Sequence, residues 1–117
     1  MPSYRVAVDV LGVPPGVDPA GVLPRAEEIL AERHRVEDRS VEVIGRQPQI
    51  HLRFLVPASH DAQEDAEAEA AVVALVRSLA TTAHLGGWQL RRGPGGRWHT
   101  IRTGTASQDA KEYPVDF

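Results

Sequence analysis

The alternation of apolar and polar side chains over residues 49–56 constrains the fold more than any other feature of this sequence. Every second position there carries a large apolar side chain: Ile50, Leu52, Phe54 and Val56. Because successive side chains of a β-strand point to opposite faces, this pattern predicts a strand with one buried face. Such a strand is not stable alone, so it requires neighbouring strands and a second layer over its apolar face.

Four other segments have the properties of strands. In residues 3–11, the apolar side chains lie on one side of the predicted strand: Tyr4, Val6, Val8 and Val10. Residues 39–45 place Val41 and Val43 on the side that we expect to be buried. A turn at residues 45–48 predicts that this strand pairs with the 49–56 strand as an antiparallel hairpin. Residues 88–92 and 97–102 are predicted to be two further strands, joined by a glycine-rich turn at residues 93–96.

Two segments have helical spacing. Apolar side chains at Ala26, Ile29 and Leu30 predict a helix over residues 24–34, after a short turn at residues 18–22. We expect Pro24 to begin this helix, because a proline inside a helix clashes with the carbonyl four residues earlier. A longer helix is predicted from Ser59 or Asp61 to about Leu85, and Gly86-Gly87 is predicted to end it. Its buried stripe comprises Val72, Leu75, Val76, Leu79 and Ala83.

The predicted elements follow the order β-α-β-β-α-β, with one more strand at the end. Right-handed crossovers would place both helices on one face of an antiparallel sheet. The predicted fold is therefore α+β, a two-layer sandwich that resembles the ferredoxin-like architecture over residues 3–102, with an extra C-terminal hairpin strand. This resemblance implies no particular activity, because many unrelated functions use the fold. We expect one domain over residues 1–102 and an extended tail over residues 103–117.

No motif for catalysis or for a cofactor emerges from the sequence. The chain has no cysteine, which excludes disulfides and thiolate chemistry. No nucleophile elbow is present. None of the histidines has a second one at the four-residue helical spacing of a zinc site: His34, His51, His60, His84 and His99. The sequence therefore predicts no catalytic residues, no metal and no cofactor.

The C-terminal hairpin has an unusual composition. Residues 86–104 contain four arginines, no acidic residue and both tryptophans of the chain. Arginine and tryptophan dominate the binding energy of protein interfaces, and they also stack on nucleic-acid bases. The sequence therefore predicts a partner-binding site in this hairpin. Its members are Trp88, Arg91, Arg92, Arg97, Trp98 and Arg102. Alternation leaves two arrangements open: either Ile101 faces the core and Trp98 is exposed, or Trp98 faces the core.

Two further surfaces bear on association. The sheet face without helices is expected to carry a mixture of apolar and charged side chains and to act as a dimer or ligand face: Arg5, Ala7, Asp9, Glu42, Ile44, His51, Arg53 and Leu55. Residues 61–80 hold five acids and one arginine, a net charge of −4. Opposite charge on this helix and on the basic hairpin would make the molecule dipolar, so we expect a homodimer.

These observations predict a small non-enzymatic domain, an interaction or regulatory module that binds another protein or itself. One alternative is a nucleic-acid-binding module that uses the Arg/Trp hairpin, although the net charge of −3 weighs against it. A second alternative is a small enzyme with its site on the open sheet face. Twelve of the 13 basic residues are Arg and Asn is absent, a composition typical of high-GC genomes, so an actinobacterial or phage adaptor would fit. The chain shows neither a signal peptide nor about 18 consecutive apolar residues, so we expect a cytoplasmic protein without membrane contact.

Overall fold

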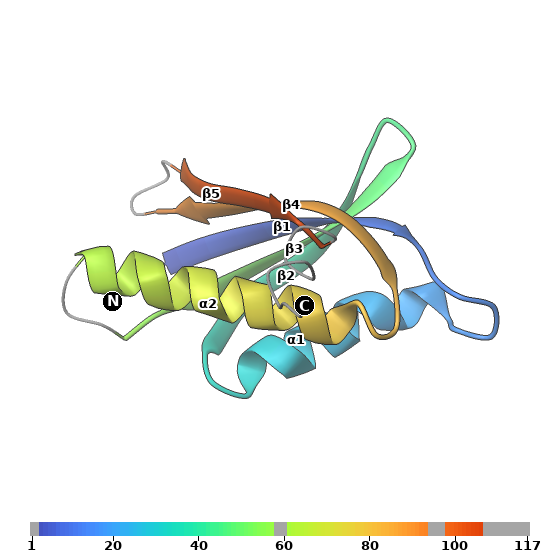
Figure 1. Cartoon of the computed structure of the whole chain (residues 1–117), viewed down its shortest axis with the longest axis horizontal. Helices are drawn as coiled ribbons and strands as arrows, with labels where there is room; N and C mark the ends of the chain where they lie inside the picture. The colour runs from blue at the N-terminus through green and yellow to red at the C-terminus, as the bar shows by residue number, and fades with distance from the viewer. Residues whose placement is uncertain (1–2, 58–60, 94–97, 107–117) are drawn as a thin grey trace, which may run out of the picture.

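Five antiparallel strands form one sheet, and two helices lie against one of its faces (Figure 1). The computed structural model describes residues 3–57, 61–93 and 98–106. Its elements are β1 (Ser3–Gly12), the 3₁₀-helix η1 (Pro19–Gly21), α1 (Val22–Ala31), β2 (Arg35–Ile44), β3 (Gln47–Leu55), α2 (Asp61–Leu79), β4 (His84–Arg92) and β5 (His99–Thr105). The predicted α+β class with an antiparallel sheet and two helices is confirmed.

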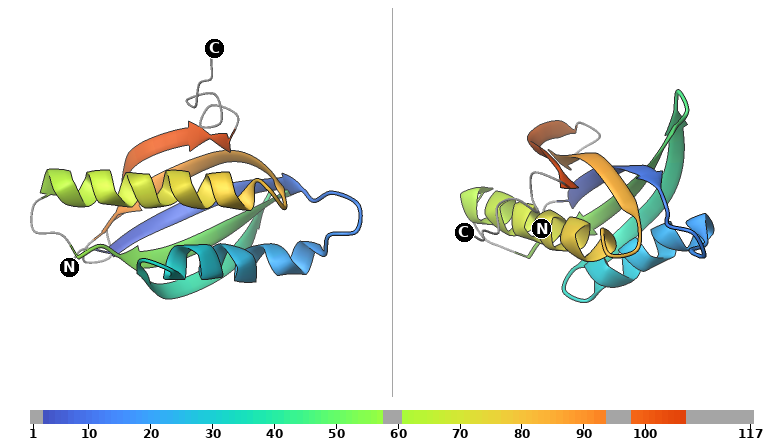
Figure 2. Two further views of the ribbon diagram at one scale, coloured as in Figure 1. Left: turned by 60° about the horizontal axis from the view of Figure 1, so that its bottom comes forward. Right: turned by 45° about the vertical axis from the view of Figure 1, so that its right-hand side comes forward.

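The first strand of the chain lies in the middle of the sheet. The strand order is β2-β3-β1-β4-β5, so β1 pairs with β3 on one side and with β4 on the other. The segments that contain α1 and α2 connect β1 to β2 and β3 to β4, and Figure 2 shows both helices on the same face. No helix of the described ranges covers the opposite face of the sheet, which we call the open face.

The core lies between the sheet and the helices, on the faces that the sequence predicts. Tyr4, Val6 and Val8 of β1 are fully buried, and Tyr4 stacks on Phe54 of β3 with ring centroids 5.9 Å apart. The predicted inward side of β3 and the predicted stripe of α2 are also buried. The periodicity of these three segments therefore identified the core correctly.

The predicted boundaries of both helices were inexact. The first helix begins at Val22 and ends at Ala31, so Pro24 occupies its first turn, where a missing N–H breaks no helical hydrogen bond. The second helix begins at Asp61 and ends at Leu79, several residues before the predicted end. The hydroxyls of Thr81 and Thr82 donate hydrogen bonds to backbone carbonyls of the last turn, which satisfies acceptors that a longer helix would have used.

The glycine pair at 86–87 does not end the helix, contrary to prediction, because both residues lie inside β4. A Cβ atom at Gly86 would lie 3.1 Å from Leu11 Cδ2 and 3.3 Å from Asp9 Cβ. The pairing of β1 with β4 shifts register in this region. Glycine is therefore needed here for the close approach of two strands rather than for a helix stop.

The predicted burial of Val41 and Val43 was wrong. Their side chains are 52% and 66% exposed. Val41 lies opposite the buried Ile50 of β3 and so shares the helix-covered face of the sheet. In Figure 1 the tip of the β2–β3 hairpin bends away from the helices, so this end of β2 is not covered by the helix layer.

The last strand continues through Thr105 and therefore includes the first residues of the predicted tail. Ala106 packs against the core. The rest of the predicted tail, residues 107–117, and Arg97 lie outside the described residues. Within the described ranges, no helix is long and apolar enough to cross a membrane.

Candidate functional site

The five described residues of the predicted hairpin site do not lie on one surface, and the sixth, Arg97, lies outside the described residues. Trp88 is only 4% exposed and belongs to the core. Its ring covers Gly104 of β5, where a Cβ atom would lie 2.6 Å from Trp88 Cζ2. Arg92 and Arg102 point to the helix side, whereas Arg91 points to the open face. Alternation along two strands therefore distributes these residues over both faces of the sheet.

Arg92 is part of an internal polar network that connects the sheet to α2. Its guanidinium donates to Glu64 Oε1 at 3.0 Å and to Asp65 Oδ1 at 2.9 Å. The Tyr4 hydroxyl donates to the same Asp65 oxygen at 2.6 Å, and Arg92 lies over the Tyr4 ring. Burial and the neighbouring Asp65 carboxylate raise the pKa of Tyr4 well above its ordinary value. The network therefore positions the first half of α2 against the sheet.

A second ion pair joins the same two layers. Arg102 Nε of β5 donates to Glu69 Oε1 of α2 at 2.9 Å. The acids of α2 and the arginines of the hairpin thus neutralise one another within a single chain. The opposite charges of α2 and the hairpin, from which we expected a homodimer, are therefore partly paired within one molecule.

Three arginines lie side by side on the open face. Arg5 of β1 is directly opposite Arg53 of β3 and directly opposite Arg91 of β4. We name these three residues the arginine row. Within the part of the chain that the structure describes, Arg53 is the member paired with a carboxylate, with its Nε 3.3 Å from Glu37 Oε1. Arg91 donates to the Gln89 amide oxygen at 2.8 Å, and its buried Nε has no hydrogen-bond partner among these residues.

Trp98 lies against the arginine row. The guanidinium carbons of Arg5 and Arg53 are 5.0 Å and 5.4 Å from the centre of its ring. The ring also approaches Gly93, where a Cβ atom would lie 3.1 Å from it. Ile101 packs against the core, as in the first of the two arrangements left open by the sequence. The Trp98 side chain, however, is half-buried on the open face rather than exposed.

A row of polar side chains lies beside the arginine row. His51 of β3 and Gln89 of β4 flank Ala7 of β1. His51 Nε2 is 2.8 Å from Gln49 Oε1, while its Nδ1 is buried and has no hydrogen-bond partner among the described residues. Burial lowers the pKa of His51, the charges of Arg5 and Arg91 lower it further, and Glu42 opposes this shift. His51 therefore remains neutral under conditions that protonate an exposed histidine.

An apolar groove lies at the other end of β1, on the helix side. It has a volume of about 410 Å³ and is formed by the end of β1, η1, the first turn of α1 and the β2–β3 hairpin. Its lining is almost entirely apolar: Val10, Leu11, Gly12, Val13, Pro19, Ala20, Val22, Leu23, Pro24, Arg39, Val41, Pro48 and Ile50. Leu11, at its margin, is 61% exposed. This groove could not be predicted from the sequence, because the pattern of β2 indicates burial but not where the helix layer ends.

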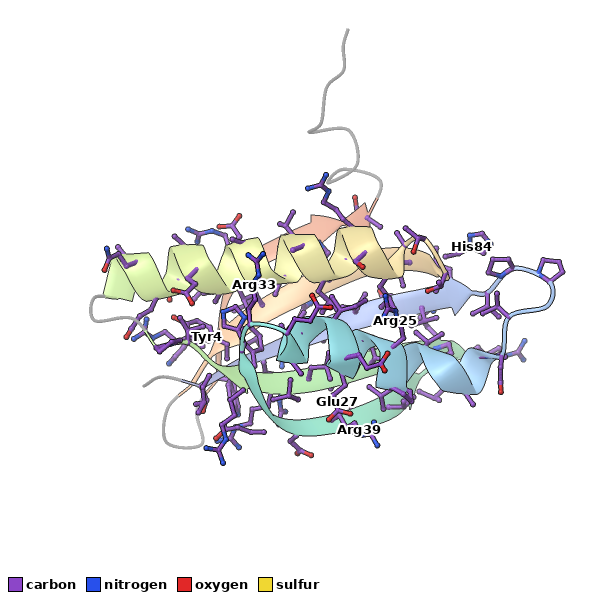
Figure 3. All side chains as sticks on the ribbon, turned by 90° about the horizontal axis from the view of Figure 1, so that it is seen from below. Tyr4, Arg25, Glu27, Arg33, Arg39 and His84 are labelled. Carbon is purple, nitrogen blue, oxygen red and sulfur yellow. The ribbon has the colours of Figure 1, made fainter. Side chains whose placement is uncertain are left out.

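Among the strands that the structure describes, β2 pairs with β3 alone, so the strand beside the groove has one free edge. Its first half carries a register shift and four charged side chains, and Figure 3 shows Arg39 and Glu27 of α1 pointing toward each other, with a hydrogen bond of 2.7 Å. Its second half exposes Val41, Val43 and Ile44. Bulges and charges are the usual protection of an edge strand. This protection is concentrated in the first half of β2.

Among the described residues, no group of three or more histidine or acidic side chains could hold a metal ion. His34 Nε2 is 3.1 Å from Glu67 Oε2, and its ring packs edge-on against Phe54. These contacts stabilise the fold. No protein-family model, curated protein or solved structure matches this chain.

Proposed function

We propose that the protein is a small interaction domain that binds an extended strand of a partner protein along the free edge of β2. The partner strand continues the sheet, and its apolar side chains enter the apolar groove. This proposal keeps the class of function predicted from the sequence. It transfers the docking surface from the C-terminal hairpin to the β2–β3 hairpin.

The distribution of exposed hydrophobic side chains carries the proposal. Five large ones are exposed among the described residues: Leu11, Val17, Val41, Val43 and Ile44. Leu11 and Val41 line the groove, and Val43 follows Val41 on the same face of β2. Contiguous apolar surface on a folded domain is typical of a protein-interaction site. These three side chains at and beside one groove support docking there.

The backbone groups along the free edge of β2 favour an extended partner segment. A free strand edge presents unpaired N–H and C=O groups, which another extended segment can satisfy. Val41 and Val43 lie on the helix-covered face, so every second side chain of an added strand would lie on that face, beside the groove. The partner segment is therefore expected to be extended, with apolar residues at alternate positions.

We also propose that the architecture is ferredoxin-like. The sheet segment β2-β3-β1-β4, antiparallel throughout, supports it, as do the two helical connections over one face. In that arrangement β5 is an addition next to β4. With this addition the sheet ends at β2 on one side and at β5 on the other, and the apolar groove lies beside β2.

Site-specific crosslinking tests the docking surface. A photoreactive amino acid at Val43 should crosslink a defined partner in cells, whereas the same group at exposed Ala74 of α2 should not. Binding of the purified partner should be weakened at least tenfold by Val43→Asp and left unchanged by the control Ala74→Asp. Hydrogen exchange should slow at residues 40–44 in the complex. Equal crosslinking from both positions, or unchanged exchange at residues 40–44, would contradict the proposal.

Self-association is a separate outcome of the same surface. Sedimentation velocity at micromolar concentration reports whether the 12.7 kDa chain forms a dimer. A dimer that Val43→Asp dissociates would identify the partner strand as β2 of a second copy. A dimer that this substitution leaves intact would show that another surface causes the association.

A further inference from the structure

We infer that the arginine row and Trp98 form a binding site for single-stranded nucleic acid on the open face of the sheet. This site goes beyond the proposed function and is independent of it, because the apolar groove lies on the helix side. Its phosphate-binding groups are Arg5, Arg53 and Arg91, and its stacking group is Trp98. The neighbouring polar row supplies groups that can contact base edges.

The arginine row is unfavourable without an anion. Directly opposed side chains of neighbouring strands lie about 4.5–5.5 Å apart at Cβ, and like charges at that spacing repel. Glu37 pairs with Arg53 at one end of the row. In the centre, the guanidinium of Arg5 lies over the Trp98 ring, and among the described residues no ion pair of Arg5 or Arg91 with a carboxylate is found. A bound anion would relieve the repulsion.

The groups around the row favour nucleic acid over an acidic protein segment. An indole ring next to guanidinium groups suits the stacking of a base, which is a contact that carboxylate side chains do not use. The next row of the sheet carries, beside His51, the Gln89 amide, which has a donor and an acceptor for base edges. A strand of nucleic acid whose phosphates lie over the arginine row and whose bases lie toward the polar row would contact both rows.

Acidic side chains elsewhere on the open face limit where a nucleic-acid strand can bind. Asp9 accepts a hydrogen bond from Gln49, and Glu42 is 3.6 Å from His51, so both acids lie on the far side of the polar row. The phosphates are therefore expected to follow the arginine row and to avoid this acidic end. With a net charge of −3 for the whole chain, binding should be moderate and strongly dependent on salt.

The salt dependence can be estimated from the number of arginines. For single strands, log K falls with log salt by about 0.7 for each neutralised phosphate. Three contacts give a slope of about −2, which makes binding about twentyfold weaker at 200 mM than at 50 mM salt. Removal of one arginine should lower the slope to about −1.4.

Fluorescence anisotropy with fluorescein-labelled ten-nucleotide oligo(dT) and oligo(U) tests the site. The wild-type chain should bind at least one of them with that slope, and Arg5→Gln, Arg91→Gln and Trp98→Leu should each weaken binding at least fivefold at 50 mM salt. Arg25→Gln on α1 is the matched control, because its side chain is exposed and belongs to the helix layer. Thermal unfolding of every variant shows that a loss of binding does not reflect a loss of fold.

Three results would overturn the inference. The first is the absence of binding to either oligonucleotide at 50 mM salt. The second is binding that Arg5→Gln and Arg91→Gln affect no more than Arg25→Gln does. The third is equal or tighter binding of a polyglutamate peptide, with the same dependence on these arginines, which would identify an acidic protein segment as the ligand. The Val43→Asp variant should bind oligonucleotide normally, so a failure here is distinguishable from a failure of the proposed function.

Discussion

Replacement of Arg92 and of Arg91 should have opposite consequences, although the two residues are neighbours in sequence. Arg92 points into the layer between sheet and α2, whereas Arg91 points to the open face. Arg92→Ala should destabilise the fold. Arg91→Ala should leave stability nearly unchanged and affect the binding of anions.

The expected loss for Arg92→Ala can be worked from its contacts. The guanidinium makes charge-assisted hydrogen bonds to Glu64 and Asp65, and bonds of this kind contribute about 1.5–3 kcal/mol each. Glu64 is 7% exposed and would lose its partner, while Arg92 is 22% exposed, which reduces the effect through solvent screening. We expect a loss of about 2–4 kcal/mol in the free energy of unfolding, or a decrease in Tm of about 10–20 °C.

Urea denaturation followed by circular dichroism measures both variants. The Arg91→Ala chain should differ from wild type by less than about 0.5 kcal/mol, as is usual for a surface substitution. A loss below about 1 kcal/mol for Arg92→Ala would show that the network contributes little to stability. A double-mutant cycle with Glu64→Gln separates this pair from the other contacts of Arg92, and a coupling energy near zero would refute the reasoning about that pair.

Three other substitutions test the packing and the electrostatics. Phe54→Ala should cost about 3–5 kcal/mol in urea denaturation, because Phe54 is fully buried in the core; a loss below about 1 kcal/mol would contradict this assignment. Gly104→Ala should cost about 1–3 kcal/mol, since its Cβ would lie 2.6 Å from Trp88 Cζ2, whereas Gly12→Ala has open space and should be nearly neutral; equal costs would contradict the close packing. The lowered pKa of His51 means that its contribution to stability is present above about pH 6.5 and is lost as the pH falls through its folded-state pKa. Stability measured from pH 7.5 to pH 5 should therefore fall less in His51→Gln than in wild type, and identical profiles would contradict this linkage.

The sequence patterns that predicted the fold correctly are periodicities within a single strand or helix. The alternation of β1 and β3 and the helical stripe of α2 depend only on local periodicity and on burial against a layer that exists. Val41 shows the same alternation, yet it is exposed, because the length of α1 and the projection of the hairpin decide what covers it. Gly86-Gly87 resembles a helix stop, and the contact with Leu11 that explains it depends on the pairing of two strands distant in sequence.

The candidate sites were less predictable for the same reason. Composition drew attention to Arg91 and Trp98, and alternation predicted that Arg5 and Arg53 lie on the open face. Their assembly into one row requires the strand order and the register between β3, β1 and β4. Arg92 and Arg102 were predicted from the same composition, but they form hydrogen bonds with carboxylates of α2. The sequence of the hairpin alone does not reveal these partners.

The central position of β1 has a consequence for how the protein reaches its fold during synthesis. Tyr4 of β1 lies opposite Phe54 of β3 and contacts Arg92 of β4, 88 residues later in the chain, so neither edge of this strand can be satisfied soon after it leaves the ribosome. Contacts of such separation slow folding, because a long loop must close before they form. We expect the β2–β3 hairpin and the helices to form first. The sheet then closes only after β4 has emerged, so apolar β1 remains a substrate for chaperones until that moment.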